Sequence, residues 1–99
     1  MNMENNAMEN NEAAIGEKVR ELEGFRMVLG HVQNMQSEYY KPDAQNPAEN
    51  GIPEWVAAVE AAQAKVGSAL LAIEKLGASV SYNSEEEKAW VEAAKERGE

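Results

Sequence analysis

The sequence predicts an all-α protein: an antiparallel hairpin of two long helices, followed by a short C-terminal helix. Apolar residues recur at alternating spacings of three and four in 13–40 and again in 53–80, which is the period of one helix face. All three prolines, Pro42, Pro47 and Pro53, lie at the junction between these segments. Because proline lacks an amide hydrogen and fixes φ, it ends helices or begins them. The two segments are therefore predicted to be helices joined by one loop.

Residues 1–12 are polar and acidic and precede the first periodic segment. Met-Glu-Asn-Asn occurs twice, at 3–6 and at 8–11, and this five-residue period matches neither a helix nor a strand. Such a composition is typical of disorder. We expect a disordered, Asn-rich acidic tail at 1–12 and a single helical domain at 13–99; the alternative is a segment that orders on a partner.

The first predicted helix spans about 13–40, roughly seven turns and on the order of 40 Å. Gly16, Gly24 and Gly30 each cost roughly 1 kcal/mol relative to alanine inside a helix. We expect Gly24 or Gly30 to mark a kink or a close helix crossing. The apolar stripe consists of Ile15, Val19, Leu22, Phe25, Val28/Leu29, Val32, Met35 and Tyr39.

The second predicted helix spans about 53–80 and begins at Pro53, a residue well suited to a first helical position. Its near-heptad spacing is typical of packing against a neighbouring helix. Gly77 is a candidate left-handed cap, but we expect the helix to continue to about Val80. Its stripe consists of Trp55, Val59, Ala62, Val66, Ala69/Leu70, Ile73, Leu76 and Val80.

A short third helix is predicted at about 85–97. Ser84 and Glu87 have the spacing of a capping box, in which the serine caps the helix and the glutamate reaches back to the N-cap amide. Its apolar face is small, and we expect Trp90 to anchor it on the hairpin.

The core of this domain is expected to be thin. Leucine, isoleucine, valine and phenylalanine supply only 17 of 99 residues, although 16 alanines favour helix. Small domains are already marginal in stability. We therefore expect the protein to be a homo-oligomer in which self-association completes a helical bundle. The alternative is that a partner protein covers the exposed core.

Charge and composition exclude several partners. The net charge of −9 disfavours direct nucleic-acid binding, which requires clustered lysine and arginine, and disfavours an anionic membrane surface. No apolar run approaches the roughly 18 residues of a membrane span. The absence of cysteine excludes disulfides and thiolate metal sites. We expect a cytoplasmic protein with no membrane association.

No pattern indicates catalysis, a metal or a cofactor. His31 is the only histidine, and a metal site needs several converging ligands. No Glu-x-x-His, Gly-x-Ser-x-Gly or glycine-rich phosphate loop occurs. The glutamates lie on faces expected to be exposed, where general acid–base chemistry is not favoured. We predict that the protein is not an enzyme.

Aromatic residues at the loop are the most informative feature. Tyr39 and Trp55 lie on the two stripes and can staple the helix ends together, whereas Tyr40 lies off its stripe. Tyrosine and tryptophan are favoured at protein interfaces, and they can also stack on planar ligands, with Lys41 supplying charge. We predict a partner-binding site made of Tyr40, Lys41, Asp43, Trp55 and Trp90.

These features favour a non-enzymatic acidic helical protein that binds and regulates or inhibits another protein. Small acidic proteins with which phages and mobile elements disarm host machinery share this profile, as an analogy of type only. One alternative is an oligomeric bundle that sequesters a small molecule or nucleotide between subunits, and a lesser one is a structural assembly subunit. An acidic surface that mimics nucleic acid is less favoured, because the charge concentrates near the two ends of the chain.

Overall fold

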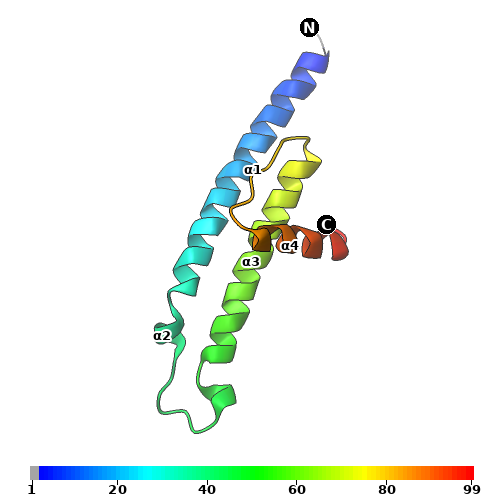
Figure 1. Cartoon of the computed structure of the whole chain (residues 1–99). Coiled ribbons are helices and arrows are strands. Elements are labelled where there is room, and N and C mark those ends of the chain that lie inside the picture. The colour runs from blue at the N-terminus through cyan, green and yellow to red at the C-terminus, as the bar shows by residue number, and fades with distance from the viewer. Residues whose placement is uncertain (1–2) are drawn as a thin grey trace.

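The computed structural model describes residues 3–99, with side chains from residue 11 onward. The described residues are all-helical and contain no strand, which confirms the predicted fold class. Figure 1 shows α1 and α3 side by side, with α4 lying across the middle of α3. The helical elements are α1 (Met3–Gln33), α2 (Gln36–Tyr39), the 3-10 turn η1 (Pro47–Glu49), α3 (Ile52–Lys75) and α4 (Glu85–Glu96).

The first long helix ends earlier than expected. The amide of Asn34 donates to the His31 carbonyl at 3.1 Å, and the amide of Met35 donates to the Val32 carbonyl at 3.0 Å. These bonds span three residues instead of four, so the α-helix ends there and α2 adds one further turn. The prediction of one helix to residue 40 was wrong. At its other end α1 includes residues 3–12, most of whose side chains lie outside the described part, and the disordered tail stays a prediction.

Few side chains of α1 enter the core. Leu22 and Leu29 are buried and Phe25 packs partly against them, whereas Met27 is 76% exposed and Val28 is 52% exposed. A Cβ atom added to Gly24 or Gly30 would meet nothing within 4 Å. The close helix crossing expected at one of these two glycines is therefore not there.

The close crossing occurs instead at Gly67, where α4 passes over α3. A Cβ atom on Gly67 would lie 2.5 Å from the Trp90 carbonyl oxygen and 2.8 Å from the Trp90 Cβ atom. Only glycine allows the two backbones to approach this closely. Val91 and Ala94 of α4 are buried beside this crossing, and Trp90 packs partly against the core. The structure thus places Trp90 where the sequence predicted an anchor.

The second long helix ends at Lys75, so its predicted extension to Val80 was wrong. Gly77 has a φ of +88°, and its amide donates to the Glu74 carbonyl at 3.0 Å. The amide of Ala78 donates to the Ile73 carbonyl at 3.3 Å. This pair of bonds is the Schellman motif, which uses a left-handed glycine to end a helix. In the view of Figure 1, the connector 76–84 runs back down alongside α3 to reach α4.

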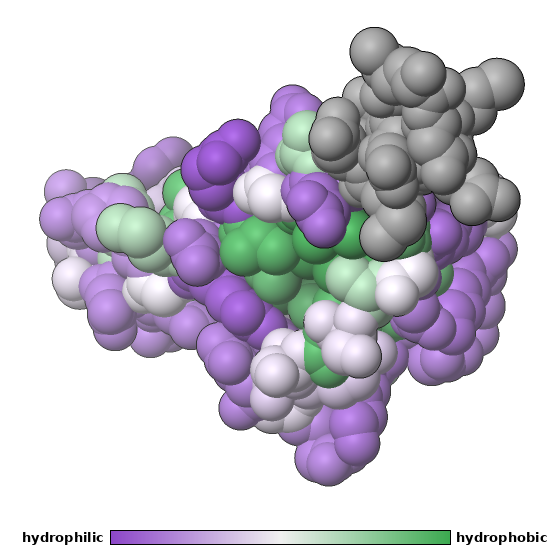
Figure 2. Space-filling model, turned by 90° about the horizontal axis from the view of Figure 1, so that it is seen from above, coloured by the Kyte–Doolittle hydropathy of each residue, from purple (hydrophilic) through white to green (hydrophobic). Residues whose placement is uncertain are grey.

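The core divides α3 into two unequal halves. Every buried side chain of α3 lies at Ala62 or beyond, and we call residues 62–75 the covered half. Residues 52–61 contribute no buried side chain, and we call them the loop half. Seen from above, apolar residues gather near the middle of this face, with hydrophilic residues to their left and right (Figure 2). The buried core consists of Leu22, Leu29, Ala62, Val66, Ala69, Leu70, Leu71, Ile73, Val91 and Ala94.

Helix α3 is long and apolar enough to cross a membrane by length and composition. An 18-residue window within it has a mean hydropathy of 1.4, and 39% of that window is buried inside the molecule. The expectation that no segment approaches a span rested on the search for an unbroken apolar run, and the sequence contains none of membrane-spanning length. The alanines of α3 raise its mean hydropathy without forming such a run, so the helix escaped that search. The central core helix of a folded domain meets the same criterion, and the absence of membrane association stays a prediction.

Candidate functional site

The loop between α2 and α3 is closed at its neck. The Lys41 amide donates to the Asn50 carbonyl at 2.7 Å, and the Asn50 side-chain oxygen accepts from the Ile52 amide at 2.9 Å. Gly51 is buried with a φ of +87°, and a Cβ atom there would collide with the Tyr39 carbonyl. The neck therefore requires glycine on two counts, and it fixes the start of α3 beside the end of α2.

Trp55 joins the first turns of α3 to the end of α1. Its indole Nε1–H donates to the Val32 carbonyl at 2.8 Å, and the side chain is partly buried. A tryptophan N–H that is removed from water needs such an acceptor. This contact corresponds to the stapling role that the sequence suggested for Trp55.

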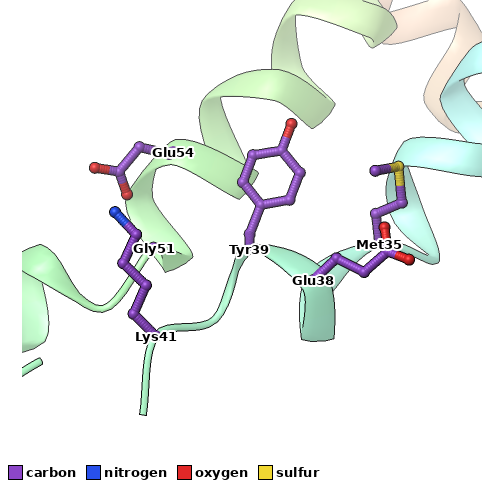
Figure 3. A pocket seen from close by; sticks show the side chains of 6 residues that line it. All are labelled: Met35, Glu38, Tyr39, Lys41, Gly51 and Glu54. Atoms are coloured by element: carbon purple, nitrogen blue, oxygen red, sulfur yellow. The ribbon is translucent and has the colours of Figure 1, made fainter. Parts of the chain in front are cut away.

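Two open pockets lie at this end of the molecule. Figure 3 shows the Tyr39 ring at the centre of the first pocket, with Lys41 and Glu54 on one side and Met35 and Glu38 on the other. The first pocket, which we call the Tyr39 pocket, has a volume of about 420 Å³ and is lined by Met35, Glu38, Tyr39, Lys41, Gly51 and Glu54. The second, the Tyr40 pocket, has a volume of about 370 Å³ and is lined by Gln36, Ser37, Tyr40 and Ile52.

The predicted partner-binding residues do not form one cluster. Tyr40 is 49% exposed, and Lys41 and Asp43 are exposed beside it in the loop. Trp55 lies nearby but is tied to α1. Trp90 lies at the α4 crossing over Gly67, twelve residues beyond Trp55 along α3, a distance of roughly 18 Å. The structure thus separates Trp90 from the loop-end residues.

No metal site is visible in the described residues. No group of three His, Cys, Asp or Glu side chains is placed to hold an ion. His31 is exposed on α1, as the sequence indicated for a surface histidine.

Sequence reasoning missed an ion pair between α1 and α4. Arg26 donates from Nε to Glu87 Oε2 at 3.0 Å and from Nη2 to Glu87 Oε1 at 2.7 Å. Arg26 Nη2 also donates to the Ser81 carbonyl at 2.9 Å, and the Asn83 amide donates to Glu87 Oε1 at 2.9 Å. Bidentate arginine–carboxylate pairs are among the stronger polar contacts in proteins. This cluster ties α1, the connector and α4 together.

The electrostatics of Glu87 follow from this cluster. Burial by itself would raise the pKa of Glu87, but the hydrogen bonds from Arg26 and from the Asn83 amide, with the positive charge of Arg26, outweigh it. The net result is a pKa below the ordinary value of 4.5. Glu87 is therefore a buried carboxylate held in its ionised form.

The position of Arg26 carried a signal that the apolar pattern obscured. It stands four residues after Leu22 and three before Leu29, so it occupies the centre of the buried stripe. An arginine there needs a carboxylate partner. Ser84 is the N-cap residue of α4, as predicted, but the capping box is not formed, because Ser84 makes no side-chain cap bond and Glu87 accepts from the Asn83 amide. Glu87 also departs from the expectation that the glutamates are exposed.

The charge of residues 34–60, which we call the loop end, differs from the charge of the rest of the molecule. Residues 34–60 contain five acidic residues and a single basic one, Lys41. All ion pairs found among the described side chains lie within residues 18–26 and 74–99. The loop end therefore carries a net charge of −4 that no ion pair offsets among those side chains.

No protein-family model matches this chain, and no match was found among curated proteins or among solved structures. Its function is therefore inferred from the geometry and the charge described above.

Proposed function

We propose that this chain is a non-enzymatic protein that binds another protein through its loop end and thereby regulates or inhibits it. One observation carries the proposal: the loop half of α3 has no buried side chain, yet it adjoins two pockets and exposed apolar residues. Tyr40 is 49% exposed and Val56 is 40% exposed on this end. Exposed apolar surface rimmed by polar residues is typical of protein interaction sites.

The scaffold for this site is proposed to be an antiparallel hairpin of α1 and α3. The Trp55–Val32 bond and the closed neck at Gly51 support it, because both hold the loop end in a fixed shape. A preorganised surface loses less conformational entropy on binding than a mobile one. These two contacts thus hold the shape of the surface where binding is proposed.

Self-association is proposed to occur elsewhere, on the outer face of α1. Met27 and Val28 are strongly exposed there, and their burial would gain about 25 cal/mol per Å² of apolar area. Multi-angle light scattering of the full chain measures this directly. A mass above one subunit that falls to the monomer value in Met27→Ser/Val28→Ser is the expected result, and a monomeric wild type contradicts it.

Binding to another protein is tested by quantitative affinity capture from cells that contain the native partners. We expect Tyr40→Ala/Val56→Ala to lose a captured protein that wild type retains. Val19→Ala is the matched control, because it removes an exposed apolar side chain of α1 that belongs neither to the loop end nor to the self-association face. Equal recovery of every captured protein by the three forms contradicts the proposed site.

A second candidate function is sequestration of a small molecule. The Tyr39 pocket favours it, because an aromatic ring, a thioether and a lysine line a space large enough for a small ligand. Mass spectrometry of what the denatured, purified protein releases tests this candidate. A stoichiometric metabolite that Tyr39→Ala no longer retains supports sequestration, and an empty protein rejects it. In both functions we propose a cytoplasmic protein without a catalytic role.

A further inference from the structure

We infer that the loop end docks a basic amphipathic segment of the partner protein. An apolar side chain of that segment fills the Tyr39 pocket, and its lysine or arginine side chains contact Glu38 and Glu54, which line that pocket. The inference rests on the proposed function, because it names the chemistry of the partner that the same surface binds.

Apolar side chains line both pockets at this end of the molecule. Met35 and the Tyr39 ring line the first pocket, and Tyr40 and Ile52 line the second. Val56, 40% exposed, stands one turn further along α3. An apolar side chain of a docked helix or extended segment enters the Tyr39 pocket, which is the helix-in-groove mode of recognition.

The acidic part surrounds the apolar part. Glu38 and Glu54 come from different helices and stand on opposite sides of the Tyr39 ring (Figure 3). A guanidinium or ammonium group above that ring is attracted by its π face and by both carboxylates. Lys41 points toward Glu54 in the same view, on the side of the Tyr39 ring away from Glu38.

The overall charge decides against other occupants. A second copy of this chain would bring another surface of net charge −4 against the first and would carry a total charge of −9. A nucleic acid would bring a phosphate backbone of the same sign. A basic segment is the occupant whose charge complements this end, and such complementarity raises association rates and selects the partner.

The test uses three helical peptides of about 18 residues, or five turns, that share one apolar stripe. Their polar positions are lysine, glutamine or glutamate. Titration calorimetry with the full chain should show the lysine peptide binding most tightly and the glutamate peptide not binding. Adding salt to about 0.5 M should weaken the lysine peptide, because salt screens exposed charges. Equal binding of all three peptides overturns the inference.

Two charge-matched variants locate the binding site. Glu38→Gln/Glu54→Gln should weaken the lysine peptide about three- to tenfold, as expected for two exposed ion pairs. Glu17→Gln/Glu23→Gln removes the same charge from exposed positions on α1 and should leave affinity within about twofold. Circular dichroism confirms that both fold. Equal weakening by the two variants means that net charge alone attracts the peptide, and this overturns the docking site.

Failure of this inference is distinguishable from failure of the proposed function. A captured protein that depends on Tyr40 and Val56 but not on Glu38, Glu54 or salt leaves the function standing and rejects the basic partner. If the Tyr40→Ala/Val56→Ala variant still captures every protein that wild type captures, the proposed function is rejected, whatever the peptides show.

Discussion

The two halves of α3 have similar alanine-rich sequences but different surroundings. In the covered half, α3 packs against α1 and is crossed by α4, and the fully buried Val66, Leu70 and Ile73 lie there. In the loop half α4 is absent, and Val56 remains 40% exposed. Burial therefore follows from where a second helix crosses, and not from the apolar stripe alone. Stability is concentrated in one half, and the proposed binding surface lies in the other.

The largest contrast is expected between Leu70→Ala and Val56→Ala. Leu70 is fully buried, so its truncation removes apolar contacts and leaves a cavity, at a cost of about 2–5 kcal/mol. Val56→Ala should change the free energy of unfolding by less than about 0.5 kcal/mol, as is usual for a surface site. Urea unfolding followed by far-ultraviolet circular dichroism measures both. Similar losses in the two variants would mean that the halves do not differ in packing.

A matched pair of glycines tests the crossing itself. Gly67→Ala forces the Trp90 backbone away, because the new Cβ atom would lie 2.5 Å from its carbonyl oxygen. Overpacking of this kind costs about 1–3 kcal/mol. Gly24→Ala adds the same atom in open space on α1 and should stabilise the protein by about 0.5–1 kcal/mol through helix propensity. Thermal unfolding should show melting temperatures that move in opposite directions, and a shift in the same direction would refute the assigned crossing.

The Arg26–Glu87 pair should make the covered half sensitive to acid. Glu87→Gln removes a charge-assisted pair and should cost about 1–2 kcal/mol at neutral pH. The pKa of Glu87 lies below its ordinary value of 4.5 in the folded state. Its stabilisation is therefore fully present above pH 4.5 and is lost as the pH falls through the folded pKa.

The comparison is made by measuring the unfolding free energy of wild type and Glu87→Gln between neutral and acidic pH. The difference between the two curves should shrink only below the ordinary glutamate range. Lys88→Met serves as a control, because it removes an exposed ion pair with Glu85 that is worth little. A wild-type advantage that persists unchanged at the lowest pH would exclude Glu87 as its source.

A local effect is expected from a variant at the bond that holds the loop half to α1. Trp55→Phe keeps an aromatic ring but removes the bond from Nε1 to the Val32 carbonyl, at a cost of about 0.5–1.5 kcal/mol. Amide hydrogen exchange should show faster exchange near residues 32–39 and little change in the covered half. Uniformly faster exchange along α3 would mean that the two halves open as one unit.

Much of the helical architecture was predictable from the sequence. The 3–4 spacing identified both long helices, and Pro53 lies one residue after the observed start of α3. The C-terminal helix, expected at 85–97, was confirmed at Glu85–Glu96. These features are set by local chemistry, which a single sequence displays.

Features set by three-dimensional contacts were not predictable in the same way. The apolar stripe continues across the break at Asn34 and Met35, so its period concealed the end of α1. Gly67 gave no local sign that another backbone would lie against it. The partner of Arg26 lies 61 residues away, and no spacing rule reaches that far. At the loop, sequence placed the aromatic residues correctly but could not separate Trp90 from them.

The closed neck of the loop has a consequence for how the chain tolerates change in length. The Lys41–Asn50 bond and the Gly51–Tyr39 contact bring the two ends of residues 42–49 together. The cost of closing a loop grows only slowly with its length, by about 0.6 kcal/mol per doubling. Residues inserted at the tip therefore leave the paired helices in register. The tip is a natural place to graft a peptide epitope or a fluorescent reporter while the neck holds the scaffold unchanged.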